Sequence, residues 1–281
     1  MIVGTRGSKL ALCQTEKVVN ELKKLGYDVN IKIIKTTGDK ILDKKLSDIG
    51  IGVFTKELDL ALLNNEIDIA VHSYKDIPTV WHDELTVAAV LKRDSPYDLM
   101  IWRKDVKDIK VIGTSSQRRR AFLKELYPNA EFKLLRGNVD TRLRKLRDKM
   151  YDAIVLAEAG IERLKIDLSE FNYKRLNILP APAQGIIAVA CRKGDREIIN
   201  ILKKINHEES YLLAECERAA LRAFGGGCLE PFGALAEYKD NILYLKAKTI
   251  KKEALGRVRC KIDDIKMARQ LGEDIGRILA S

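Results

Sequence analysis

The feature that most constrains the fold is a repeated alternation of short apolar strands with amphipathic helices, joined by polar turns. Residues 67–71 alternate and are rich in β-branched side chains, which predicts a strand, and Pro78 prevents a long helix from beginning directly after it. The same strand-then-helix order is predicted at 2–25, 111–127 and 132–157. We therefore expect an α/β fold, in which ligands bind at the loops that follow the carboxyl ends of strands.

The chain has 281 residues, more than one hydrophobic core usually holds, which predicts two or three domains. Polar or proline-rich breaks occur at 92–96 and 180–185, and 186–190 is an apolar run typical of a buried strand. If this strand returns to the first sheet, the chain crosses twice between two lobes. We expect domain 1 at 1–93 with 188–207 returning to it, an anion-binding domain 2 at 94–187, and a small α+β domain 3 at 208–281.

The formal charge of +11 at pH 7 predicts an anionic partner, either a nucleic acid or a small molecule that carries carboxylates or phosphates. The five cysteines form no CxxC pair and there are only three histidines, so we expect neither a disulfide framework nor a metal site. The first residues lack the apolar region of a signal peptide, and no apolar run approaches the roughly 18 residues of a membrane span. We therefore expect a soluble, cytoplasmic protein.

Four chemically active side chains occur within five residues, His72 to Asp76, at the end of the predicted strand. Taken alone, this stretch is better explained as a polar turn with a solvated Lys75–Asp76 pair than as a catalytic loop. Its function depends on what the rest of the chain brings to it.

Basic residues recur at predicted strand-to-helix turns, and these are Arg6-Gly7-Ser8, Thr114-Ser115-Ser116 with Arg118 and Arg119, and Arg136-Gly137-Asn138 with Arg142. Free backbone N–H groups and the helix dipole favour anions at such turns, and arginine adds a fork that matches a carboxylate. Each turn alone is explained by a helix cap beside solvated arginines. Three of them on two lobes predict a single anion-binding cleft.

The stretch Gly225-Gly226-Gly227-Cys228 predicts either a mobile or left-handed loop that presents a thiol, or a helix C-cap followed by a small buried residue. No histidine is near in sequence, which argues against protease-type chemistry. A thiol that carries a covalent group permanently needs no such partner.

With these motifs in this order, the chain resembles the porphobilinogen deaminase (hydroxymethylbilane synthase) family nearly from end to end. The motifs that carry the resemblance are Arg6-x-Ser8-x-Leu10-Ala11 with Gln14, Thr37-Gly38-Asp39 with Asp43, Phe54-x-Lys56-Glu57-Leu58, Val71-His72-Ser73-x-Lys75-Asp76-x-Pro78, Gly113-Thr114-Ser115-Ser116-x-Arg118-Arg119, Arg136-Gly137-Asn138-x-x-Thr141-Arg142-Leu143, Pro180-Ala181-Pro182-x-Gln184-Gly185 and Gly226-Gly227-Cys228.

The resemblance implies a transferase of haem and other tetrapyrrole biosynthesis, with two lobes like those of two-hinge periplasmic binding proteins and a small third domain. The sequence leaves the oligomeric state open, and because nothing in it suggests an interface, we expect a monomer. It implies that four porphobilinogen molecules are joined head to tail, with release of ammonia, to give linear hydroxymethylbilane. The chain grows on a dipyrromethane cofactor attached by a thioether to Cys228. Nucleic acid and membrane are not expected partners.

The resemblance also assigns roles to residues. Asp76 is the catalytic carboxylate that stabilises the cation left when porphobilinogen loses its amine. The residues expected to bind carboxylates of the cofactor and substrate are Arg6, Ser8, Lys75, Ser115, Ser116, Arg118, Arg119, Arg136, Arg142, Arg163 and Gln184. Asp39, Phe54 and Lys56 belong to the loop motifs, and no metal is expected.

The chain departs from the family pattern at a few positions. Ile51 stands where a loop lysine is usual, Ala183 replaces a usual glycine, and Tyr74 occupies a position that is usually aliphatic or Met. Glu230 begins a Glu-Pro-Phe run that is usually apolar on both sides of the proline. The alternatives are a non-enzymatic two-lobed protein that binds small anions, and a nucleic-acid binder, although the sequence lacks a basic-aromatic stripe and a helix-turn-helix pattern.

Overall fold

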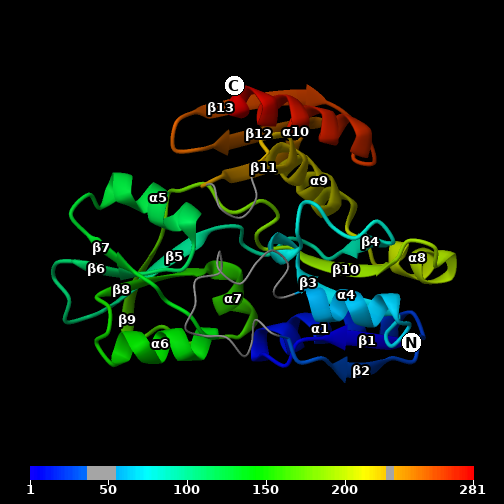
Figure 1. Cartoon of the computed structure of the whole chain (residues 1–281), viewed down its shortest axis with the longest axis horizontal. Coiled ribbons are helices and arrows are strands. Elements are labelled where there is room, and N and C mark those ends of the chain that lie inside the picture. Colours follow the sequence, from blue (N-terminus) through cyan, green and yellow to red (C-terminus); the bar gives the residue numbers. More distant parts are fainter. Residues whose placement is uncertain (37–54, 226–230) are drawn as a thin grey trace.

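The computed structural model describes residues 1–36, 55–225 and 231–281, which form two α/β lobes and a smaller third unit (Figure 1). The sheet of the first lobe has the strand order β2 (Asn30–Ile33), β1 (Ile2–Thr5), β3 (Ile69–Ser73), β10 (Ile187–Arg192) and β4 (Leu85–Val90). Its helices are α1 (Lys9–Lys24), α4 (Lys56–Leu63) and α8 (Arg196–Lys203).

Side-chain alternation decides which helix covers which face of this first sheet. Ile69 and Val71 of β3 pack with Val18 and Leu22 of α1, in a cluster that α8 completes. Ala70, between them, faces the other way and packs against α4. The central strands of this sheet therefore have apolar helices on both faces, whereas the edge strand β2 is exposed to solvent.

The second lobe has a sheet of the order β7 (Glu131–Lys133), β6 (Val111–Gly113), β8 (Ala153–Ala157), β5 (Asp98–Arg103) and β9 (Phe171–Arg175). Helices α6 (Val139–Arg147) and α7 (Glu158–Arg163) pack on one face, and α5 (Gln117–Leu126) packs on the other. The strands predicted from the sequence include β6, β7 and β8 but not β5 or β9.

Both lobes follow one topological plan. In each sheet the first three strands are parallel, with the earliest in the middle, and the fourth strand in the order runs antiparallel to both of its neighbours. That antiparallel strand is β5 in the second lobe and β10 in the first. Each is the first strand after the chain crosses from one lobe to the other, so one crossing joins the edge strand β4 to β5 and the other joins the edge strand β9 to β10.

The two crossings are hydrogen-bonded to each other. Asp94 N donates to the carbonyl oxygen of Gly185 at 3.0 Å, and Arg93 Nε donates to that of Gln184 at 2.9 Å. Gly185 has φ +87°, and a Cβ there would lie 2.5 Å from the Asp94 carbonyl oxygen, so only glycine fits this approach. Ala183 has φ +60°, a conformation that costs an L residue about 1–2 kcal/mol and explains why glycine is usual at this position.

The third unit is an antiparallel sheet of β11 (Gly233–Lys239), β12 (Ile242–Lys248) and β13 (Glu253–Arg259), covered by α9 (Glu208–Ala223) and α10 (Ile265–Ala280). Gly272 and Gly276 of α10 allow the two helices to pack closely. A Cβ at either position would lie 2.2–2.4 Å from a carbonyl oxygen of α9. Figure 1 shows α9 running from this unit toward the first lobe. The expected fold class, two α/β lobes with a small α+β unit, is confirmed.

Among the described residues, no helix is long and apolar enough to cross a membrane.

Candidate active site

Asp76 lies at the carboxyl end of β3, in a single 3-10 turn, η1 (Tyr74–Asp76). Tyr74 N donates to the carbonyl oxygen of Ile186 at 3.0 Å, and Ile77 N closes the turn on the Tyr74 carbonyl at 3.2 Å. Asp76 is exposed, and its carboxylate has no hydrogen-bond or ion-pair partner among the described residues. The carboxylate is therefore available to a ligand.

The polar neighbours of Asp76 in sequence have separate roles. His72 is buried, and burial together with the charge of Arg6 lowers its pKa to about 4, so it is neutral at physiological pH. Lys75 is half-buried, and its Nζ donates to Gln184 Oε1 at 3.2 Å. Burial and the charge of Arg119 lower the Lys75 pKa to about 8, although Asp76 opposes that shift. Lys75 is thus a cation beside Asp76 that loses its charge in mildly alkaline solution.

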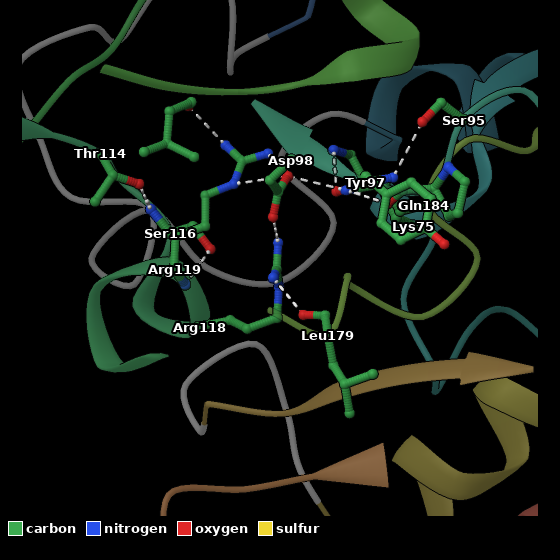
Figure 2. A network of polar contacts seen from close by, with 12 residues as sticks. Lys75, Ser95, Tyr97, Asp98, Thr114, Ser116, Arg118, Arg119, Leu179 and Gln184 are labelled. Atoms are coloured by element: carbon green, nitrogen blue, oxygen red, sulfur yellow. Dashed lines mark hydrogen bonds and ion pairs between the residues drawn. The ribbon is translucent and has the colours of Figure 1, made fainter. Parts of the chain in front are cut away.

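A fully buried carboxylate, Asp98, organises the cations of the second lobe (Figure 2). Arg118 Nη2 donates to Asp98 Oδ2 at 2.7 Å, whereas Arg119 donates to Oδ1 from Nη2 at 2.7 Å and from Nε at 3.1 Å. Gln184 Nε2 reaches the same Oδ1 at 2.9 Å. Burial alone would raise the Asp98 pKa, but the two guanidinium charges and their hydrogen bonds hold it far below its usual range.

The two arginines lie in the first turn of α5, which has a side-chain cap at its N-terminus. Ser116 is the N-cap of α5, and its hydroxyl accepts a hydrogen bond from Arg119 N at 3.3 Å. Arg118 also donates to the Leu179 carbonyl at 2.6 Å, and Arg119 to the Val155 carbonyl at 3.0 Å. Each guanidinium keeps N–H groups that these bonds do not use, and Arg118 Nε is buried without a partner among the described residues. These unused donors fit the carboxylates of an anionic ligand.

A second basic group lies at the connection between β7 and α6 of the same lobe. Arg142 Nε donates to the carbonyl oxygen of Gly137 at 2.7 Å, and Arg136 is buried. The pKa of Arg142 is lowered to about 10 by burial and by the charges of Arg119 and Arg136, whereas Asp76 acts to raise it. These mutual effects place Arg142 within electrostatic reach of both Asp76 of the first lobe and Arg119 of the second.

The remaining predicted residues have structural partners as well. Ser8 is the N-cap of α1 and accepts from Ala11 N at 3.2 Å, and Ser115 Oγ donates to the Leu135 carbonyl oxygen. Arg163 Nε pairs with Asp94 at 2.7 Å, and its Nη2 donates to the Gly185 carbonyl at 2.7 Å. Arg163 therefore ties α7 to both interlobe crossings.

Other predicted residues lie at or beyond the edge of the described chain. Lys56 is exposed at the first turn of α4. Asp39, Phe54 and Cys228, and the departures Ile51 and Glu230, lie outside the described residues. Among the residues that are described, no group of three or more His, Cys, Asp or Glu side chains could hold a metal ion.

Asp98 is not among the predicted site residues, because strand β5 is not predicted from the sequence. The available signal was an Asp before the apolar run Leu-Met-Ile-Trp, directly after the polar break at 92–96. Glu217 is also absent from the prediction. It is fully buried in α9 and accepts from Arg93 at 2.6 Å and from the backbone N–H groups of Ala183 at 2.6 Å and Ala236 at 2.8 Å. Glu217 joins the third unit to both interlobe crossings.

Fold and site together define a two-lobed α/β protein in which arginine and lysine side chains lie around an exposed carboxylate, a set of groups suited to binding a polycarboxylate. The chain belongs to the porphobilinogen deaminase family. The family model described as "Porphobilinogen deaminase, dipyromethane cofactor binding domain" matches residues 1–200, and "Porphobilinogen deaminase, C-terminal domain" matches residues 211–280.

Similar proteins are found in archaea and bacteria. A probable porphobilinogen deaminase of Methanocaldococcus jannaschii is 67% identical over 284 residues, which covers 98% of this chain and 97% of that protein. A probable porphobilinogen deaminase of Archaeoglobus fulgidus is 44% identical, and the match covers 98% of this chain and 97% of that protein. The porphobilinogen deaminase of Syntrophomonas wolfei is 44% identical over 254 residues, and the match covers 87% of this chain and 83% of that protein.

The chain is therefore a transferase of tetrapyrrole biosynthesis with porphobilinogen deaminase activity and a domain that binds a dipyrromethane cofactor. The family, the activity and the cofactor expected from the sequence are confirmed. The alternative of a non-enzymatic anion-binding protein is rejected.

Proposed function

We propose that this enzyme joins four porphobilinogen molecules head to tail, releases one ammonia for each, and then uses one water molecule to free the product as linear hydroxymethylbilane. Asp76 is the catalytic residue. The observation that supports this role is an exposed carboxylate without a protein partner among the described residues, at a strand end and beside the cations Lys75 and Arg142.

The chemistry requires a negative charge at this point. When porphobilinogen loses its amine, the remaining pyrrole becomes an electron-poor cation, and a fixed carboxylate stabilises that charge as it develops. Two unit charges about 4 Å apart attract by about 1 kcal/mol in water but by about 4 kcal/mol at an effective dielectric of 20. Once bound substrate excludes water around Asp76, its carboxylate therefore contributes more to the transition state than a solvated one would.

The cations bind the carboxylates of the substrate and of the growing chain. Arg118, Arg119 and Arg142 supply unused N–H donors, and Arg6, Arg136 and Lys75 add positive charge around them. The bound dipyrromethane supplies the pyrrole carbon to which the first substrate is joined. We propose Cys228 as its point of attachment through a thioether.

The proposed domain division is 1–93 with 188–207, 94–187, and 208–281. It is supported by β10, which belongs to the sheet of β1–β4, and by the break between the two matched family regions at 200 and 211. We also propose that the enzyme is a monomer, and cytoplasmic location remains a prediction.

Replacement of Asp76 tests the catalytic proposal directly. Asp76→Asn keeps the size of the side chain and removes its charge, so we expect turnover to fall by at least 100-fold, with the circular dichroism spectrum unchanged. Asp83→Asn is the matched control, because Asp83 is also exposed in the same lobe. Turnover of Asp76→Asn within a few fold of the parent enzyme would remove Asp76 from the mechanism.

The attachment proposal has its own measurement. The intact mass of the enzyme isolated with its cofactor should exceed the mass calculated from the sequence by one dipyrromethane unit. Cys228→Ala should lose that added mass, and Cys13→Ala, which changes a half-buried cysteine of α1, should keep it. An adduct that persists in Cys228→Ala would place the attachment elsewhere.

A further inference from the structure

Helix α9 of the third unit lies against the loop that carries Asp76. Arg218 of α9 is only 6% exposed, and its guanidinium donates to three carbonyl oxygens of that loop. They belong to Tyr74 at 3.3 Å, Ile77 at 2.9 Å and Pro78 at 2.7 Å. The acceptors therefore lie on both sides of Asp76 in sequence, and one side chain holds them together.

Tyr74 gives the loop a second attachment to the third unit. Its hydroxyl donates to Glu215 Oε1 at 2.7 Å, and the other oxygen of Glu215 accepts from Arg269 Nε of α10 at 2.8 Å. The Tyr74 ring also lies under Arg218, with 4.6 Å between the guanidinium carbon and the ring centroid. Burial and the charge of Glu215 keep the Tyr74 pKa well above its usual value, so the hydroxyl remains a donor.

This arrangement restricts the backbone of the catalytic loop. A buried guanidinium is stabilised only while its N–H groups stay bonded, and rotation of the 74–78 backbone would break two or three of these charge-assisted bonds at once. Lysine has a single ammonium group and cannot reproduce the planar fork that spans three carbonyls. The position of the Asp76 carboxylate is thus set from the third unit and not from the first lobe alone.

We propose that Arg218 and Tyr74 are positioning residues of the deaminase reaction, which hold the loop of Asp76 at the place where the substrate cation develops. The inference rests on the proposed role of Asp76. It explains the departure at Tyr74, because an aliphatic side chain at that position could not reach Glu215 with a hydrogen bond. It also makes α9 a direct connection between the catalytic loop and the segment that contains Cys228, five residues beyond the end of α9.

The test uses the holoenzyme with three single substitutions, Arg218→Lys, Tyr74→Phe and Arg222→Gln. Arg222 is the matched control, because it lies one turn further along α9 and is exposed. A displacement of about 1 Å at a catalytic group can cost on the order of 100-fold in rate, so we expect kcat of Arg218→Lys to fall by about 10- to 100-fold. Tyr74→Phe loses one hydrogen bond to a charged group, for which we expect roughly a 10-fold fall.

Two further measurements separate positioning from loss of structure. KM should stay within about threefold and the cofactor mass should be unchanged, since these residues do not touch the carboxylate-binding cations. Amide hydrogen exchange of a peptide that covers 72–78 should become faster in both variants and stay at the parent rate in Arg222→Gln. Tyr74→Phe keeps the ring and the fold, so it remains informative if Arg218→Lys is unstable.

The outcomes distinguish this inference from the role of Asp76. If Asp76→Asn loses activity while Arg218→Lys and Tyr74→Phe keep the parent kcat, the positioning inference is wrong and the catalytic proposal stands. If Asp76→Asn keeps its activity, the catalytic proposal is wrong. A fall in kcat without faster exchange at 72–78 would also contradict positioning of the loop.

Discussion

Replacement of Asp98 by asparagine is the sharpest test of how the basic site is held together. In the parent enzyme one carboxylate oxygen accepts from Arg118, and the other accepts from Arg119 and Gln184. Asparagine offers one oxygen and one NH2 group, so in either orientation a donor faces a buried guanidinium. The substitution keeps the shape of the side chain and leaves two buried positive charges without their counter-ion.

The expected cost follows from burial. Asp98 is fully buried and both arginines are nearly so, and removing one partner of a buried ion pair usually costs about 3–5 kcal/mol. The free energy of unfolding is measured by urea titration in a Trp81→Phe background. The unfolding is monitored by the fluorescence of Trp102, which lies on β5. The control is Glu170→Gln, which breaks the half-exposed pair with Arg147 and should cost less than about 1 kcal/mol. A loss for Asp98→Asn no greater than this control would refute the reasoning.

The pH dependence provides an independent check. The pKa of Asp98 is lower in the folded protein than its unfolded value of about 3.9, so its contribution to stability is complete above about pH 5. This contribution is lost as the pH falls below about 4 toward the folded pKa. The stability difference between the parent and Asp98→Asn should therefore shrink in acid and stay constant between about pH 6 and 8.

Two further predictions concern charge and backbone. Because the pKa of Lys75 is about 8, we expect the KM for porphobilinogen to rise from pH 7 to pH 9 as Lys75 loses its charge. Lys75→Gln should remove this pH dependence of KM. If KM of Lys75→Gln changed with pH as in the parent enzyme, the prediction would be contradicted. Gly185→Ala places a methyl group 2.5 Å from the Asp94 carbonyl and should lower the thermal midpoint by several degrees, whereas Gly194→Ala, where nothing lies within 4 Å, should change it little.

Local sequence pattern located most of the elements and much of the site. The strand at 67–71 and the caps Ser8 and Ser116 depend on residues within a few positions, so periodicity and capping preferences identify them. Strands β5 and β9 were missed because β5 begins at an Asp and β9 is mostly exposed, which removes the alternation that marks a strand. Asp98 was missed with β5.

The sequence by itself determined the family, the α/β class and the stretch that contains Asp76, because these follow from the order of short motifs along the chain. Tertiary structure alone decided how the charges pair. Arg118 and Arg119, expected only as ligands for substrate, share the buried Asp98 some 20 residues away, and Arg218 reaches a carbonyl 140 residues away. Such pairings depend on which elements the fold places together, and a buried charge must find its partner wherever the packing puts it.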